Sequence, residues 1–187
     1  IIVPCVHNER QLFLRSDPSM EGGGLGVAGA TVPHKIRKNL PAASQYIENF
    51  KHRKTLTCLM AKAFAASAEP SAFHRWIAAQ EQLPLVVHAW YDNLVTQAFA
   101  TRVNWGLVQG VTQSEHFGDW VNWLRPDGSV VPTKEFIRDG SGAKAPAEAP
   151  QETHQWRTLV YEPLGAAWPA SNFIVSDSDY VEVLTEI

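Results

Sequence analysis

The residues best placed to do chemistry are His88 and Asp92, which lie four positions apart in the segment LPLVVHAWYDNLVTQAF (residues 83–99). An imidazole titrates near neutral pH and can act as a general base, and a nearby carboxylate can orient it. Each side chain also has a structural explanation. His88 could close the core and hydrogen-bond a backbone group, and Asp92 could cap the helix that follows it.

The segment around these two residues has the pattern of a strand followed by a helix. The short apolar run at residues 85–87 indicates a buried strand, and the apolar residues of 94–99 recur at the spacing of one helix face. In an open parallel sheet, ligands bind at the carboxyl ends of the strands, where the turn between such elements lies. We therefore expect His88 and Asp92 at the edge of the sheet where these folds place their chemistry.

The rest of the chain predicts an α/β fold with a mostly parallel sheet and helices on both faces. Helical composition covers residues 42–67, with a break near Lys51 and His52, and a further helix is expected at 71–80, with Trp76 facing the core. The ranges 1–6 and 104–113 have strand character, and the turn at 126–129 predicts a hairpin. Ser176 and Asp179 form a capping box for a last helix near residue 177.

We expect a single domain over residues 1–187, with loops near 16–33 and 139–153. Strand character begins at residue 1, and the last helix runs for only a few residues before the chain stops. These features suggest a piece of a longer protein, truncated at both ends, or a short version of the domain.

Other motifs in the chain are weaker. Gly24, Gly26 and Gly29 form a G-x-G-x-x-G pattern, but no strand precedes it, so a loop is expected rather than a cofactor-binding turn. The seven histidines show no H-x-x-x-H or H-E-x-x-H spacing, so we predict no metal site. The pair at 115–116, Glu and His, is a lesser acid–base candidate. The two cysteines, 5 and 58, are expected to be buried thiols rather than a disulfide.

Composition narrows the range of functions. The chain has 187 residues, 45% hydrophobic content and a net charge of −3, which suits one domain with a substantial core and argues against nucleic-acid binding. No apolar run approaches the ~20 residues that a membrane span needs, and no signal peptide opens the chain, so we expect no membrane association and a cytoplasmic location. Seven tryptophans can serve both a core and an interface.

Several stretches, in order, resemble bacterial SIR2-like (sirtuin-related) domains. Residues 88–92, HAWYD, resemble the end of the family's signature strand, Thr-x-Asn-Tyr-Asp. Residues 159–165, LVYEPLG, resemble its strand ending in Leu-His-Gly, and residues 174–176 resemble its next strand, followed by Asp179 and Tyr180 at a helix start. The resemblance implies a Rossmann-like fold in which the two signature segments meet. Family members with intact motifs deacylate proteins or hydrolyse NAD, often in defence against phage.

The resemblance implies a pocket for NAD or an ADP-ribose-like nucleotide, lined by Trp90, Tyr91, Asp92 and Gly165. Asp92 matches the family acid that holds the nicotinamide amide. The chain departs from the pattern elsewhere. Trp90 replaces the signature Asn, Leu164 replaces the catalytic His, and residues 7–9, His-Asn-Glu, replace the phosphate-binding glycines. We therefore expect a catalytically inactive domain in which Trp90 fills the pocket rather than stacking on a ligand.

Two further hypotheses remain open. The chain could be a non-catalytic module that binds a protein partner or assembles with further domains of a larger protein. It could also be an enzyme, similar to NAD hydrolases, with a site rebuilt around His88, Asp92 and His7.

Overall fold

The computed structural model describes residues 2–3, 32–33, 35–36, 39–64, 69–110, 121–132, 149–169 and 171–185. Several sequence predictions therefore lie outside the described residues: the glycine-rich motif, the first strand beyond residue 3, Cys5, His7, and the pair Glu115 and His116. Within the described parts of the chain, no helix has both the length and the apolar composition of a membrane span.

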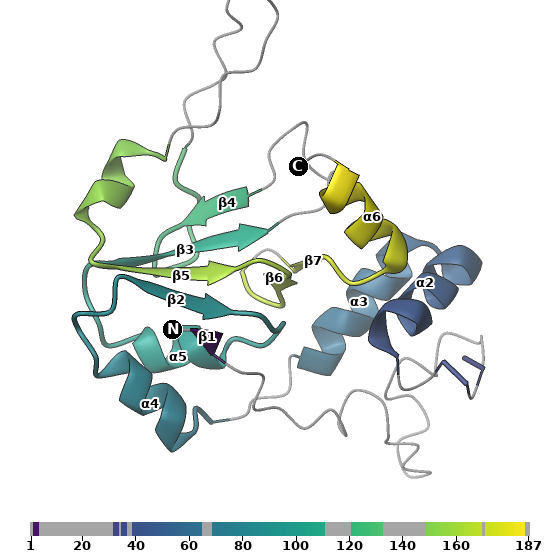
Figure 1. Cartoon of the computed structure of the whole chain (residues 1–187), viewed down its shortest axis with the longest axis horizontal. Helices are drawn as coiled ribbons and strands as arrows, with labels where there is room; N and C mark the ends of the chain where they lie inside the picture. Colours follow the sequence, from purple (N-terminus) through teal and green to yellow (C-terminus); the bar gives the residue numbers. More distant parts are fainter. Residues whose placement is uncertain are drawn as a thin grey trace, which may run out of the picture.

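The fold is a mixed α/β arrangement built on a five-stranded sheet in the order β1-β2-β5-β3-β4 (Figure 1). Neighbouring strands run parallel from β1 to β3, and β4 is antiparallel to β3. The predicted mostly parallel sheet is thus confirmed. The strands are β1 (Ile2–Val3), β2 (Leu85–His88), β3 (Trp105–Gly110), β4 (Val121–Leu124) and β5 (Thr158–Glu162).

Two short helices, α4 (Ala72–Ala78) and α5 (Leu94–Phe99), cover one face of this sheet. Apolar side chains of both helices pack on alternate residues of the central strands in one buried cluster, which includes Ile77, Phe99 and Val160. Burying such side chains stabilises the layer by about 1.5–3 kcal/mol each. The expected helix at 71–80 is confirmed, but Trp76 is 53% exposed and does not face the core.

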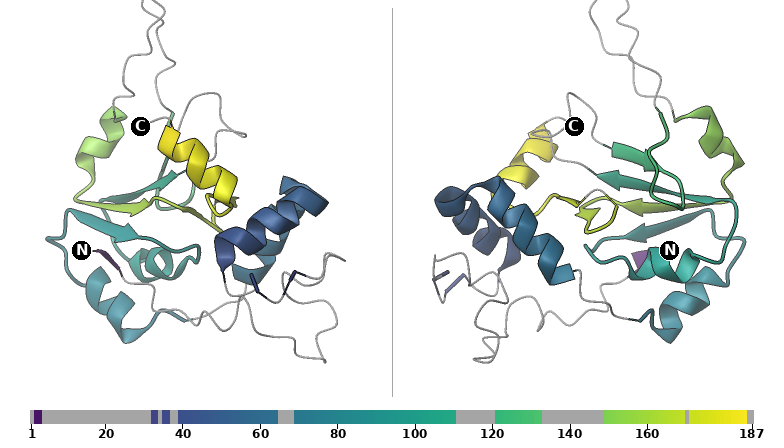
Figure 2. Two further views of the ribbon diagram at one scale, coloured as in Figure 1. Left: turned by 45° about the vertical axis from the view of Figure 1, so that its right-hand side comes forward. Right: turned by 180° about the vertical axis from the view of Figure 1, so that it is seen from behind.

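The other described α-helices, α2 (Leu40–Lys51), α3 (Arg53–Phe64) and α6 (Asp177–Thr185), pack beyond the carboxyl ends of the parallel strands (Figures 1 and 2). Apolar side chains of α2 and α3 form a second cluster, whose described members include no residue of the five-stranded sheet. Helices were expected on both faces of the sheet, but the described helices cover only one face. The apolar faces of α2 and α3 pack against each other and against the small hairpin formed by β6 (Gly165–Ala166) and β7 (Asn172–Phe173) instead.

That hairpin corrects one predicted strand. β6 (Gly165–Ala166) pairs with β7 (Asn172–Phe173), so the strand expected at 174–176 lies two residues earlier. Ile174 and Val175 are buried in the chain that leads to α6 but do not pair as a strand.

Local signals in the sequence correctly predict the boundaries of other elements. The break between α2 and α3 falls at His52, whose φ of 74° ends the first helix. The turn at 126–129 joins β4 to Val130 and Val131, with the Ser129 carbonyl accepting from Arg125 N–H. A short 3-10 helix, η3 (Gln151–Gln155), precedes β5.

Cys58, expected to be buried, is exposed on α3.

Candidate functional site

The two segments that resemble the sirtuin-related signatures lie side by side. The backbone N–H of Ala167, just after β6, donates to the carbonyl of Tyr91 at 2.8 Å. Trp90, Tyr91 and Leu164 belong to the same apolar cluster. The predicted neighbourhood of residues 88–92 and 164–165 is therefore confirmed.

Trp90 packs within this cluster. It is half-buried, and its ring centroid lies 6.0 Å from that of Phe64, edge to face, and 5.3 Å from that of Tyr91. Leu164 is also half-buried and packs against the same cluster. Aromatic contacts at these distances contribute about 0.5–1.5 kcal/mol beyond simple burial. Trp90 and Leu164 are therefore used for packing.

Tyr91 is positioned by burial and by a hydrogen bond to the backbone. Its side chain is 1% exposed, and its hydroxyl donates to the carbonyl of Ile174 at 3.0 Å. Burial, followed by the neighbouring Tyr180, raises the pKa of the Tyr91 phenol, so the side chain stays neutral. Tyr91 thus connects residues 88–92 to the chain that leads into α6.

Gly165 is required by the β6–β7 hairpin. Its φ is +73°, a conformation that L side chains rarely adopt, and a Cβ atom added there would overlap the backbone carbonyl of Asn172. This packing explains the glycine without any ligand.

Replacing Gly165 by Ala is expected to lower the free energy of unfolding by about 3 kcal/mol, because the strained φ and the clash with a backbone atom add. Gly128→Ala is the matched control. Its φ is also positive, at +83°, but its added Cβ would approach the Trp168 side chain, at 2.7 Å, rather than a backbone carbonyl. Urea denaturation of both variants tests the assignment. An equal loss in the two would show that the carbonyl contact contributes nothing.

His88 and Asp92 do come together at the carboxyl end of β2. The imidazole is 3% exposed, and its Nε2 lies 3.6 Å from Oδ1 of Asp92. The same Oδ1 accepts from the backbone N–H of Leu94 at 2.8 Å, so Asp92 satisfies a backbone donor at the start of α5 as expected, although the N-cap residue is Asn93. Among the described residues, the ring nitrogens of His88 contact carboxyl groups and no backbone group, so the expected hydrogen bond from His88 to the backbone is not seen there. Its Nδ1 lies instead 3.4 Å from Oε1 of Glu162.

Glu162 and Gln109 are site residues that the sequence did not reveal. Glu162 ends β5 and is completely buried, and Gln109 lies directly opposite it on β3. The amide nitrogen of Gln109 donates to Oε2 of Glu162 at 2.6 Å and to the carbonyl of Trp168 at 2.7 Å. We call Asp92, His88, Glu162 and Gln109 the buried polar row.

Strand register brings this row together. Val87 pairs with Tyr161, so His88 lies level with Glu162, and Glu162 pairs with Gln109. Side chains two positions apart on a strand share a face. The row therefore continues, toward the carboxyl ends, the same sheet face on which Val86 and Val160 meet α5.

The electrostatics of the row are dominated by burial. Loss of solvation raises the pKa of Glu162, while the His88 ring and the Gln109 amide act in the opposite direction and Asp92 raises it further. Such an arrangement can hold or move a proton between the carboxyl and the imidazole. Among the described residues, no group of three His, Cys, Asp or Glu side chains has the geometry of a metal site.

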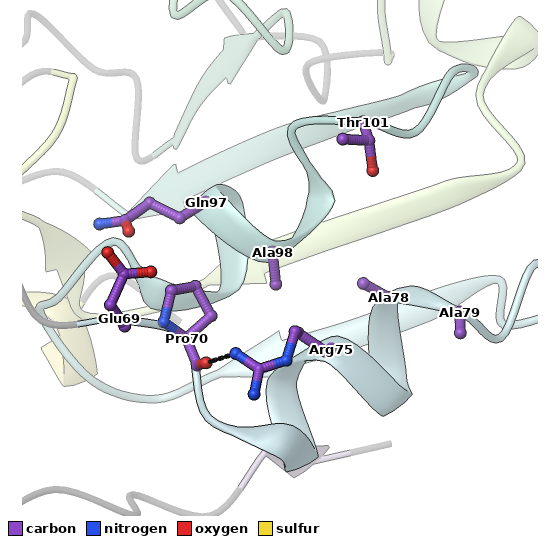
Figure 3. Close-up of a pocket in the computed structure, with 8 residues that line it drawn as sticks. All are labelled: Glu69, Pro70, Arg75, Ala78, Ala79, Gln97, Ala98 and Thr101. Carbon is purple, nitrogen blue, oxygen red and sulfur yellow. Dashed lines mark hydrogen bonds between the residues drawn. The ribbon is translucent and has the colours of Figure 1, made fainter.

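A groove of about 510 Å³ lies elsewhere, between α4 and α5 (Figure 3). Its volume is within the range of small-molecule sites. It is lined by short side chains, including Ala78 and Ala98, and by polar ones, including Glu69 and Gln97. Arg75, which also lines it, donates to the carbonyl of Pro70. None of the residues singled out in the sequence lines this groove.

Comparison with known proteins assigns no family: no protein-family model matches the chain, and no curated protein is significantly similar to it.

Proposed function

We propose that this chain is a divergent, Rossmann-like relative of the sirtuin-related domains that carries out neither NAD hydrolysis nor NAD-dependent deacylation. The observation that supports the proposal is the packing of Trp90 and Leu164 in one apolar cluster with Phe64 and Tyr91. In this reading, the segments that would hold a nicotinamide nucleotide in the family join the sheet to α2 and α3 instead.

The chemistry of the replacements supports an inactive domain. By the resemblance, an Asn at position 90 would contact ribose and water through its amide, and an indole cannot reproduce that contact. A His at position 164 would accept a proton from a ribose hydroxyl, and Leu164 has no group that can do so. Losing a general base alone typically costs about 10²–10⁴-fold in rate. With both groups replaced, turnover is expected to fall below detection.

Incubation of the purified protein with NAD, followed by measurement of released nicotinamide, tests this proposal. We expect no release above a protein-free blank, with an active NAD-hydrolysing enzyme as the positive control. Robust release that disappears in an Asp92→Ala variant would overturn the proposal, because it would place NAD chemistry in this chain.

The second candidate function is an acid–base enzyme with a site rebuilt at His88 and Asp92. The observation that favours it is the position of the His88 ring between two carboxyl groups, at 3.4 and 3.6 Å. The burial of His88 argues against it, since a substrate could reach the ring only after the segments around it move. Nicotinamide release that is abolished by His88→Gln would support this candidate over an inactive domain. The partner-binding module remains a prediction.

A further inference from the structure

The groove between α4 and α5 has a polar end and an apolar end (Figure 3). Glu69, Arg75 and Gln97 supply a carboxylate, a guanidinium and an amide, and their side chains lie at the end next to Pro70. The rest of the groove is lined by short side chains, which are those of Ala78, Ala79, Ala98 and Thr101. A ligand with charged groups at one end and an apolar side chain at the other matches this division.

Two opposite charges lie at the polar end. Arg75 donates one N–H to the carbonyl of Pro70, and its guanidinium has further N–H groups that a ligand can accept from. Glu69 directly precedes Pro70, and no ion pair joins the Glu69 and Arg75 side chains, both of which the structure describes. Both side chains are exposed, so a small molecule can reach them from solvent. The polar end can therefore bind an anionic and a cationic group of one ligand.

We propose that this groove binds a free α-amino acid with a large apolar side chain. The carboxylate of the ligand accepts from Arg75, whose planar guanidinium matches it, and the ammonium donates to Glu69. The amide nitrogen of Gln97 donates to Asn93, so the amide oxygen of Gln97 is an acceptor for the same ammonium. The groove shares no residue with 88–92 or 164–165, so the proposal does not depend on whether the chain binds or cleaves NAD.

The shape of the groove favours a large apolar side chain on the ligand. Ala78 and Ala98 line it from the two helices, and their methyl groups leave space that longer side chains would fill (Figure 3). The volume of about 510 Å³ accommodates a ring as well as the two charged groups. Each buried CH₂ group strengthens binding by about fourfold. The affinity should therefore rise from glycine to leucine and phenylalanine.

Titration of the ¹⁵N-labelled protein with L-phenylalanine, followed by nuclear magnetic resonance, tests this proposal. We expect saturable shifts of the backbone amides of Ala79, Ala98 and Thr101, with a dissociation constant of roughly 1–5 mM for a ligand of this size. Two analogues separate the charged groups: 3-phenylpropionate lacks the ammonium, and 2-phenylethylamine lacks the carboxylate. Each should bind about tenfold more weakly than phenylalanine, because each loses a hydrogen bond between charged groups.

Two variants assign the charged groups of the ligand to side chains of the groove. Arg75→Gln should weaken the binding of phenylalanine about tenfold and leave that of 2-phenylethylamine unchanged. Glu69→Gln should weaken the binding of phenylalanine to a similar extent and leave that of 3-phenylpropionate unchanged. Glu81→Gln is the control, because Glu81 is exposed but does not line the groove.

If a variant does not fold, the comparison of phenylalanine with its two analogues on the wild-type protein still decides. The proposal is refuted by the absence of saturable shifts with phenylalanine, or by shifts confined to residues outside the groove. It is also refuted if both analogues bind as tightly as phenylalanine, or if Arg75→Gln and Glu69→Gln bind phenylalanine as the wild type does. Either result would show that the charged end of the groove does not recognise the amino acid.

Discussion

Replacing Asp179 by Ala is expected to lower the free energy of unfolding by about 3 kcal/mol, the low end of the cost of removing one member of a buried ion pair, because the Arg53 side chain is 20% exposed. The Asp179 carboxylate accepts two hydrogen bonds from Arg53, at 2.7 and 2.8 Å, and one each from the backbone N–H groups of Val175 and Ser176. Arg53 also donates to the carbonyl of Phe173. Asp179 therefore joins α3 to the start of α6 and to the chain leaving β7.

Asp177→Ala is the matched control for this variant. Asp177 begins the same helix but is exposed, so it contributes only a favourable interaction with the helix dipole, about 0.3–1 kcal/mol. Urea denaturation of the two variants separates the capping and ion-pair role from a general effect of acidic residues. Equal losses in both variants would show that the contacts of Asp179 add nothing beyond the dipole term.

The second large effect is expected at Tyr91. Tyr91→Ala should cost about 3–5 kcal/mol, as for other fully buried aromatic residues, because the ring is enclosed by the second apolar cluster. Tyr91→Phe should cost about 1–3 kcal/mol, because it leaves the Ile174 carbonyl without its hydrogen bond.

Trp90→Ala is the comparison variant for Tyr91, since the two residues are neighbours in sequence and in the cluster. Because Trp90 is only half-buried, we expect its truncation to cost about 2 kcal/mol, less than a fully buried aromatic would. Thermal or urea unfolding of the three variants ranks them by their loss of stability. If Trp90→Ala cost nothing, Trp90 would not fill space in the cluster, and its ring would be available to a ligand.

Much of the fold could be predicted from local signals. The strand, turn and helix of residues 85–99, the break at His52, and the capping box of Ser176 and Asp179 all depend on residues close together in sequence. In the capping box, Ser176 N–H donates to Asp179, and the hydroxyl of Ser176 accepts from Asp179 N–H at 3.4 Å. Patterns of this kind are set by the geometry of one helix turn, so they do not depend on the tertiary structure.

The buried polar row could not be predicted in the same way. Glu162 lies 74 residues from His88 and 53 from Gln109, and their contacts depend on which strands become neighbours and in which register. The alternation of buried residues in TLVYE does place Glu162 on the same face as Val160, but a single carboxylate at a strand end is no motif. The position of α2 and α3 could also not be predicted from local signals, because an apolar helix face does not specify what covers it.

We propose that Trp90 and Leu164 fill the place where a nicotinamide nucleotide would bind in a sirtuin-related domain. The most direct test is thermal unfolding of the wild-type protein with and without NAD or ADP-ribose at about 1 mM. A ligand present at a hundredfold excess over its dissociation constant stabilises a protein by about 2.7 kcal/mol, a readily measured shift. We expect an unchanged melting temperature with either nucleotide. A clear rise that is lost in the Asp92→Ala variant would contradict it, because the signature segment would then hold a nucleotide after all.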